Sequence, residues 1–188
     1  KGVITAGSVF DPIRNELFYA ERGQGAYLNE RRLRVSGRRH MSESLFGTGI
    51  PFLGRGTEDD HKQFIHELSN VMPRCAGIRR YGAAALDLAY VAAGRLDGFW
   101  EFGLKPWDIA AGILLIKEAG GLVSDFSGKD NYFSNGNIVL GNICYQNFWS
   151  KLEPYLEGVS TVYFSPEGVY SKINLNVLYD STLSSFLI

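Results

Sequence analysis

The sequence predicts a layered α/β fold, in which helices cover the faces of sheets. Apolar segments of strand length alternate with helical segments of ten or more residues, as in folds of that class. Apolar residues recur at helical spacing over 106–119, whereas 97–102 alternates between two faces. The chain has 188 residues, 45% of them hydrophobic, so it can bury a core and form a globular domain.

The N-terminal part is predicted to be an antiparallel meander. Residues 2–10 and 16–21 are rich in strand-forming residues, and Gly23 and Gly25 mark a turn into a third strand at 26–28.

Three further segments alternate between strand and helix. We predict a short strand at 44–50 and a helix that begins after Thr57, because a hydroxyl cap followed by acidic residues is a helix-start signal. A strand at 75–80 then leads to Gly82, and the helix after it ends at Gly94.

The next strand places a carboxylate on a core-facing side. Phe99 and Trp100 are expected to point to opposite faces, with Glu101 on the face of Phe99. A charged residue in that position usually has a partner or a ligand. The alternative is a surface salt bridge with Lys105 or Arg79.

Asp108 is the polar exception at the start of an otherwise apolar helix that ends at Gly120-Gly121. It could cap the helix by accepting hydrogen bonds from backbone N–H groups. It could also be a metal ligand, since Mg²⁺ prefers carboxylate oxygens together with phosphate and water. The residue pattern alone favours the cap. Beyond this helix, strands are predicted at 122–126 and 137–141 and a helix at 145–156.

The turn at Gly82, Ala83 and Ala84 is a second candidate site. Backbone N–H groups at the start of a helix can donate to an oxyanion or a hydroxyl, and glycine permits close approach. An ordinary tight turn packed by alanines is the alternative, and the pattern alone favours it.

Charge and cysteine content argue against several functional classes. A net charge of −1 gives no general attraction to nucleic acid, and the basic segment 31–40 is interpreted as a solvated loop. Cys75 and Cys144 belong to no disulfide or zinc motif, so reduced thiols in a cytoplasmic protein are expected. No apolar run reaches the length of a membrane span, so no membrane partner is predicted.

Four segments resemble consecutive blocks of the inositol monophosphatase family, whose members are Mg²⁺-dependent phosphatases of small sugar and polyol phosphates. The resemblance covers about residues 1–155. The blocks are SVFDPIRNELFYAERGQGAYLNERRLRVS at 8–36, FGTGIPF at 46–52, RRYGAAALDLAYVAAGRLDGFWE at 79–101 and the most specific one, KPWDIAAGILLIKEAGG at 105–121.

The resemblance implies a layered α/β sandwich of the sugar-phosphatase type and a role for each site residue. Asp108 matches a ligand to one catalytic Mg²⁺ that also borders the substrate. Gly82, Ala83 and Ala84 match a turn that touches the substrate, and Glu101 matches a glutamate that binds a substrate hydroxyl. The implied substrate is inositol monophosphate or a related polyol or sugar phosphate.

Other metal ligands of the family have no counterpart in this chain. They are an upstream glutamate and two aspartates of a DPxDGT-like loop. Asp11-Pro12 begins like that loop, but Arg14 stands where the second aspartate should be, so we interpret it as a turn between strands. Two-metal hydrolysis needs several convergent carboxylates.

The chain is therefore expected to be the C-terminal half of a phosphatase domain, residues 1–157, with no complete catalytic set and no activity alone. A non-catalytic module that binds polyol phosphate, or a dimerisation module, is the alternative. A homodimer is an open expectation under either hypothesis.

Residues 158–188 are expected to form a separate β-rich tail. The segment 159–188 resembles a short piece of a caspase-like CHAT domain without its catalytic His and Cys, so no peptidase function follows. A turn at Ser165-Pro166-Glu167-Gly168 is predicted to join strands at 161–164 and 169–179.

Overall fold

The structure is a computed structural model that describes residues 2–141, 178–180 and 185–187. Contacts divide the chain into one unit of residues 1–147 and another of 148–188. The predicted boundary at 157/158 and the predicted helix at 145–156 lie outside the described residues. So does the predicted turn at Ser165.

An antiparallel sheet forms the N-terminal part of the first unit, as predicted. Its strands pair in chain order and are β1 (Ala6–Asp11), β2 (Glu16–Glu21), β3 (Gly25–Leu28) and β4 (Arg31–Arg32). The first three were predicted, whereas β4 lies in the basic segment 31–40, which was wrongly interpreted as loop at these two residues because they continue the sheet by pairing with β3. The turn after β1 forms because a carboxylate oxygen of Asp11 accepts hydrogen bonds from the backbone N–H groups of Ile13 and Arg14. Asp11-Pro12 is thus a turn between two strands, as expected.

A mixed sheet forms the centre of the unit. Its strand order is β6-β5-β7-β9-β8, with β5 parallel to both β6 and β7, and β9 antiparallel to β7 and β8. The strands are β5 (Leu45–Thr48), β6 (Gly77–Arg79), β7 (Gly98–Glu101), β8 (Leu122–Ser124) and β9 (Ile138–Gly141). Each lies within one of the predicted strand segments.

Helices connect these strands. They are η1 (Met41–Glu43), α1 (Glu58–Val71), η2 (Met72–Arg74), α2 (Ala84–Ala92), α3 (Pro106–Glu118) and α4 (Tyr132–Asn135). Thr57 caps α1 as predicted: its hydroxyl accepts from the Asp60 N–H, and the Asp60 carboxylate accepts from the Thr57 N–H. The short α4 was not predicted, and it ends at Gly136 in the left-handed conformation.

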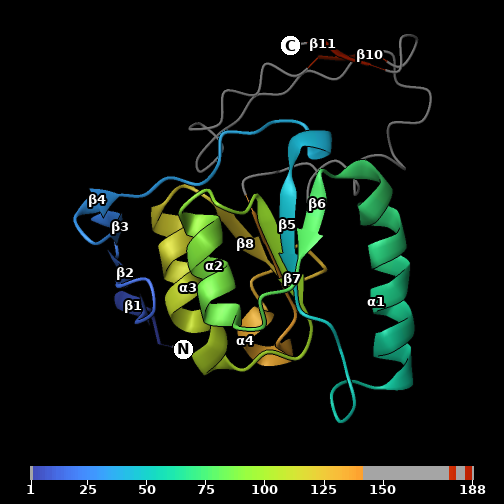
Figure 1. Ribbon diagram of the computed structural model, residues 1–188, viewed down its shortest axis with the longest axis horizontal. Helices are drawn as coiled ribbons and strands as arrows, with labels where there is room; N and C mark the ends of the chain where they lie inside the picture. Colours follow the sequence, from blue (N-terminus) through green and yellow to red (C-terminus); the bar gives the residue numbers. More distant parts are fainter. Residues whose placement is uncertain (1, 142–177, 181–184, 188) are drawn as a thin grey trace. The chain divides into compact units, whose positions relative to one another are not determined.

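The elements of the first unit lie in layers (Figure 1). The β1–β4 sheet covers one side of α2 and α3, the mixed sheet covers their other side, and α1 lies beyond the mixed sheet. Phe99 belongs to the core on the α2–α3 side, whereas Trp100 packs with Phe46 and Phe64 on the α1 side. The predicted opposite orientation of Phe99 and Trp100 is confirmed.

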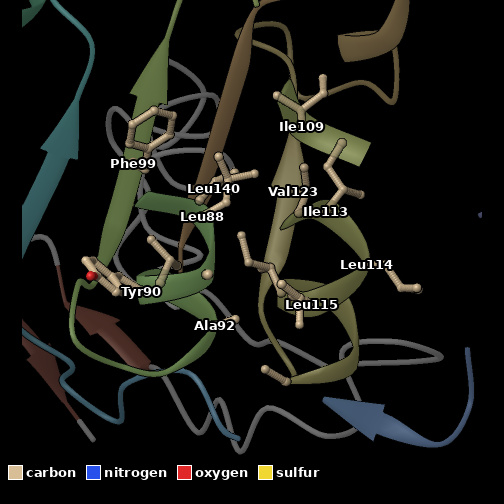
Figure 2. Packing of buried hydrophobic residues seen from close by; sticks show 14 of the residues in the cluster. Leu88, Tyr90, Ala92, Phe99, Ile109, Ile113, Leu114, Leu115, Val123 and Leu140 are labelled. Carbon is tan, nitrogen blue, oxygen red and sulfur yellow. The ribbon is translucent and has the colours of Figure 1, made fainter. Parts of the chain in front are cut away.

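Helices α2 and α3 pack side by side and run in the same direction (Figure 2). A Cβ atom at Gly112 would overlap the side chain of Leu88, so glycine permits this close approach. On the other side of α3, Gly7 in β1 lies so close that a Cβ atom there would be 2.9 Å from the Ala111 Cα. Large side chains at either glycine would separate the layers.

A second pair of strands, β10 (Leu178–Asp180) and β11 (Ser185–Leu187), is antiparallel. Of the strands predicted for the tail, only residues 178 and 179 fall within the described part, and they belong to β10.

Candidate functional site

The carboxyl ends of the three parallel strands bring the sequence-predicted Glu101 to one edge of the mixed sheet, together with two residues that were not predicted. Gly49 follows β5, Arg80 follows β6, and Glu101 is the last residue of β7. In Figure 2, α2 runs from Leu88 to Ala92 and α3 from Ile109 to Leu115 in the direction opposite to the β7 arrow, so both helices begin toward the end at which β7 terminates. Ligands of open α/β sheets bind at such an edge.

Glu101 lies in a constrained position. A Cβ atom at Gly49 would overlap the Glu101 carboxyl group, so only glycine leaves room for it. Burial raises the pKa of Glu101, the charges of Arg55 and Arg80 oppose that rise, and Asp108 adds to it. Within the described residues no hydrogen bond or ion pair joins Glu101 to Lys105 or Arg79, so the predicted alternative of a salt bridge was wrong for these partners.

The start of α2 contains the predicted Gly-Ala-Ala turn. Gly82 adopts a positive φ of 91°, which disfavours any other residue, and Ala83 is the N-cap without a capping side chain. The guanidinium of Arg80 lies over Gly82: its Nη1 would be 2.9 Å from a Cβ atom there. All three residues before Ala84 are exposed, so the turn faces solvent at the edge of the sheet.

Asp108 caps α3. Its Oδ2 accepts a hydrogen bond of 2.9 Å from the Lys105 N–H, and its own N–H donates to the Lys105 carbonyl. The cap therefore has direct structural support, and it leaves the other carboxylate oxygen for a further contact. Because Asp108 raises the pKa of Glu101, the two carboxylates are within electrostatic reach of each other.

The donor set is too small for a two-metal centre. Among residues 2–141, 178–180 and 185–187, no cluster of three or more His, Cys, Asp or Glu side chains could hold a metal ion. Asp108 with Glu101 as its acidic neighbour provides fewer carboxylates than two-metal hydrolysis requires. No hydrolytic step is therefore assigned to the described residues alone.

Asp87, which the sequence analysis did not single out, is the most perturbed carboxylate of the site. Its side chain is only 2% exposed, and its Oδ1 has no hydrogen-bond partner among the described residues. Burial, and then the charge of Glu101, raise its pKa to about 7. The signal was a single acid within the apolar sequence Ala84–Ala92, which the structure buries on most sides.

Asp87 and Glu101 lie along the same face of β5. A Cβ atom at Gly47 would be 3.9 Å from the Asp87 Oδ1, and one at Gly49 would overlap Glu101. Residues 47 and 49 are two positions apart in the chain, so their side-chain directions point to the same side. Within the described residues no hydrogen bond or ion pair joins Gly82 to Asp108. The Arg80 guanidinium lies over Gly82, and its charge acts on both Glu101 and Asp87.

Comparison with known proteins gives the site its context. The model of the "Inositol monophosphatase family" matches residues 1–158. The chain is 56% identical to the inositol-1-monophosphatase of Mesorhizobium japonicum over 142 residues, which are 76% of this chain and 52% of that protein. It is 51% identical to the Nus factor SuhB of Pseudomonas aeruginosa, covering 83% of this chain and 58% of that protein.

A solved structure extends the similarity to the fold. The crystal structure of the extragenic suppressor protein suhB from Bartonella henselae superposes with a TM-score of 0.73 at 50% identity, covering 84% of this chain and 58% of that one. The layered α/β sandwich predicted from the sequence is therefore confirmed.

These matches also limit what can be transferred. The chain spans only about half the length of the curated relatives it matches. The family match ends at residue 158, and the resemblance of residues 159–188 to a CHAT domain finds no support in it.

In the described part of the chain, no helix is long and apolar enough to cross a membrane. With a family model matched over most of its length, the chain belongs to the inositol monophosphatase family.

Proposed function

We propose that this chain supplies polyol recognition and one metal-binding carboxylate to a Mg²⁺-dependent phosphatase of inositol monophosphate or a related polyol or sugar phosphate. The observation that carries the proposal is the placement of Glu101 at the end of β7 and of Asp108 in the first turn of the next helix, α3, at the carboxyl edge of the parallel strands. That edge is where α/β folds bind ligands. The relatives of this phosphatase family lend it further support.

Each group has a distinct part in recognition. The Glu101 carboxylate accepts hydrogen bonds from substrate hydroxyls, and the exposed turn at Gly82, Ala83 and Ala84 offers backbone N–H donors. Asp108 supplies a carboxylate oxygen to Mg²⁺, whose chemistry when bound would be to neutralise the phosphate and activate water. Hydrolysis needs additional carboxylates, so we expect no turnover by this chain alone.

A non-catalytic module that binds polyol phosphate is the second candidate. The scarcity of carboxylates in the described residues favours it, because recognition needs Glu101 and the α2 turn but no metal pair. A homodimer and a cytoplasmic location stay predictions.

Calorimetry with inositol 1-phosphate, with and without Mg²⁺, separates the two candidates. The phosphatase hypothesis predicts that Mg²⁺ tightens binding, whereas the binding-module hypothesis predicts the same affinity in both conditions. Absence of binding in both conditions would contradict both. Phosphate release at an ordinary enzymatic rate would show that the chain needs no further carboxylates.

Asp108→Asn tests the metal role directly. Asparagine still caps a helix but lacks the charge that Mg²⁺ prefers, so the free energy of unfolding should fall by less than about 1 kcal/mol. The Mg²⁺-dependent gain in affinity for inositol 1-phosphate should disappear. Asp59→Asn, at an acid of α1 that is almost fully exposed, is the control. An unchanged Mg²⁺ dependence in Asp108→Asn would leave Asp108 as a cap only.

A further inference from the structure

Two arginines meet at one aromatic ring beside the proposed polyol site. The guanidinium carbon of Arg55 lies 5.4 Å from the centre of the Phe52 ring, and that of Arg80 lies 6.0 Å from it. Both distances fall in the range of cation–π attraction. Phe52 lies in the loop after β5 and is 48% exposed. Its ring therefore brings the positive charge of Arg55, from the same loop, near that of Arg80, which follows β6.

Neither guanidinium is neutralised by a described carboxylate. Arg55 and Arg80 both lower the pKa of Glu101, so both lie within electrostatic reach of it. Across the residues whose structure is described, however, no ion pair or side-chain hydrogen bond joins either guanidinium to an acid.

The sheet order places the arginines and Asp108 on different elements around Glu101. Arg55 follows β5 and Arg80 follows β6, whereas Asp108 lies in the helix after β7. Strand β7 adjoins β5 on one side, and β6 lies beyond β5. A ligand that presents its phosphate to Asp108 and a hydroxyl to Glu101 would therefore direct the far side of its ring toward Arg55 and Arg80.

We propose that Phe52, Arg55 and Arg80 form an anion-binding subsite that favours polyols with a second phosphate group over polyol monophosphates. Guanidinium groups match phosphate oxygens in geometry and charge, and here the contacts with the Phe52 ring bring two of them together. The inference rests on the proposed function, because Glu101 must orient the polyol ring for its far side to reach the arginines.

Calorimetry on the whole chain with inositol 1-phosphate and inositol 1,4-bisphosphate tests the subsite. We expect the bisphosphate to bind about tenfold more tightly, corresponding to two partly exposed ionic contacts. Arg55→Gln and Arg80→Gln should each reduce the affinity for the bisphosphate about threefold and change that for the monophosphate less than twofold. The preference should weaken in high salt, because exposed charges are screened.

Arg79→Gln is the matched control. It removes the same charge from a neighbouring residue whose guanidinium donates to the Ile78 carbonyl and lies against Gly77 of β6. Its affinities for both ligands should equal those of the unaltered chain. Phe52→Leu keeps both charges and should lower bisphosphate affinity by releasing the two side chains.

The outcomes separate the subsite from the function on which it rests. Equal affinity of the unaltered chain for the two ligands, or an equal loss in Arg79→Gln, would overturn the subsite and leave polyol recognition intact. Failure of the chain to bind inositol 1-phosphate in any condition would overturn the proposed function, and the subsite with it.

Discussion

Asp87 and Asp97 are both almost fully buried against β5, yet only Asp97 has partners for both of its carboxylate oxygens. The Asp97 Oδ2 accepts a hydrogen bond of 2.7 Å from the Leu45 N–H, and the Arg38 guanidinium donates to both of its oxygens at 3.1 Å. The Asp87 Oδ1, beside Gly47, has no such partner in the described part of the chain.

The difference follows the direction of the strand. Asp97 directly precedes β7 and accepts a hydrogen bond from Leu45, the first residue of β5, so it connects the starts of these two strands. Asp87 lies toward the carboxyl end of β5, beside Glu101. The Ala83 backbone N–H serves the Asp87 carboxyl, but one of its oxygens lacks a partner among the described residues. Buried polar groups are normally satisfied, so such an oxygen is more often found where a ligand binds than where a fold is held together.

Removing Asp97 should have the largest effect on stability. Asp97→Ala leaves the Leu45 N–H without an acceptor and the Arg38 guanidinium without its carboxylate, so we expect a loss of about 3 kcal/mol in the free energy of unfolding. Urea unfolding measures it. Asp97→Asn, which keeps one acceptor, should lose about half as much. A loss below about 1 kcal/mol in the alanine variant would mean that this pair contributes little.

Asp87 should make stability depend on pH in the opposite sense to an ordinary paired acid. Its pKa is about 7 in the fold, above that of the unfolded chain, so the fold binds the proton more tightly. Its stabilising contribution is complete below about pH 4 and is lost as the pH rises to about 7.

Asp87→Asn removes that loss, because asparagine is neutral in both states. At pH 8 we expect the variant to be more stable than the unaltered chain by about 2 kcal/mol, less than the full linkage value because the amide also needs partners. At pH 4 the two should be nearly equal. Unfolding in urea at both values measures the difference, with Asp59→Asn as control. The same difference at both pH values would rule out titration of Asp87 as its cause.

Glu101→Gln should have the smallest effect. The charge of Glu101 contributes to the raised pKa of Asp87 after burial does, so its removal should move the pH transition in stability to a lower pH without abolishing it. A pH series of urea unfolding curves locates the midpoint. If the midpoint does not move, the two carboxylates do not interact, and the site is less compact than its geometry suggests.

Local signals predicted most of the secondary structure. The Thr57 cap fixed the start of α1, and the alternation of Phe99 and Trp100 gave the two faces of β7, because each signal depends on residues close in the chain. The short α4 escaped prediction, since four residues are too few to show a helical period.

The candidate site was predicted only in part. Glu101, Asp108 and the Gly82 turn came from motif resemblance, and strand ends and helix starts bring them to one edge. Asp87 was missed because a single acid in an apolar helix has no pattern of its own. The association of Arg55 with Arg80 depends on the parallel pairing of β5 with β6, residues far apart in sequence, which no local periodicity reveals.

At Gly49, one added methyl group would disturb the Glu101 carboxyl by steric overlap, without removing any charge from the chain. Any larger residue there would occupy the volume of the Glu101 carboxyl and drive it away from the sheet edge. A Gly49→Ala chain would retain every acid and every arginine, so its charge would be unchanged. The added methyl group would nevertheless displace the Glu101 carboxyl from the position in which it could bind a polyol. The requirement for glycine at this position therefore comes from the shape of its neighbour, Glu101.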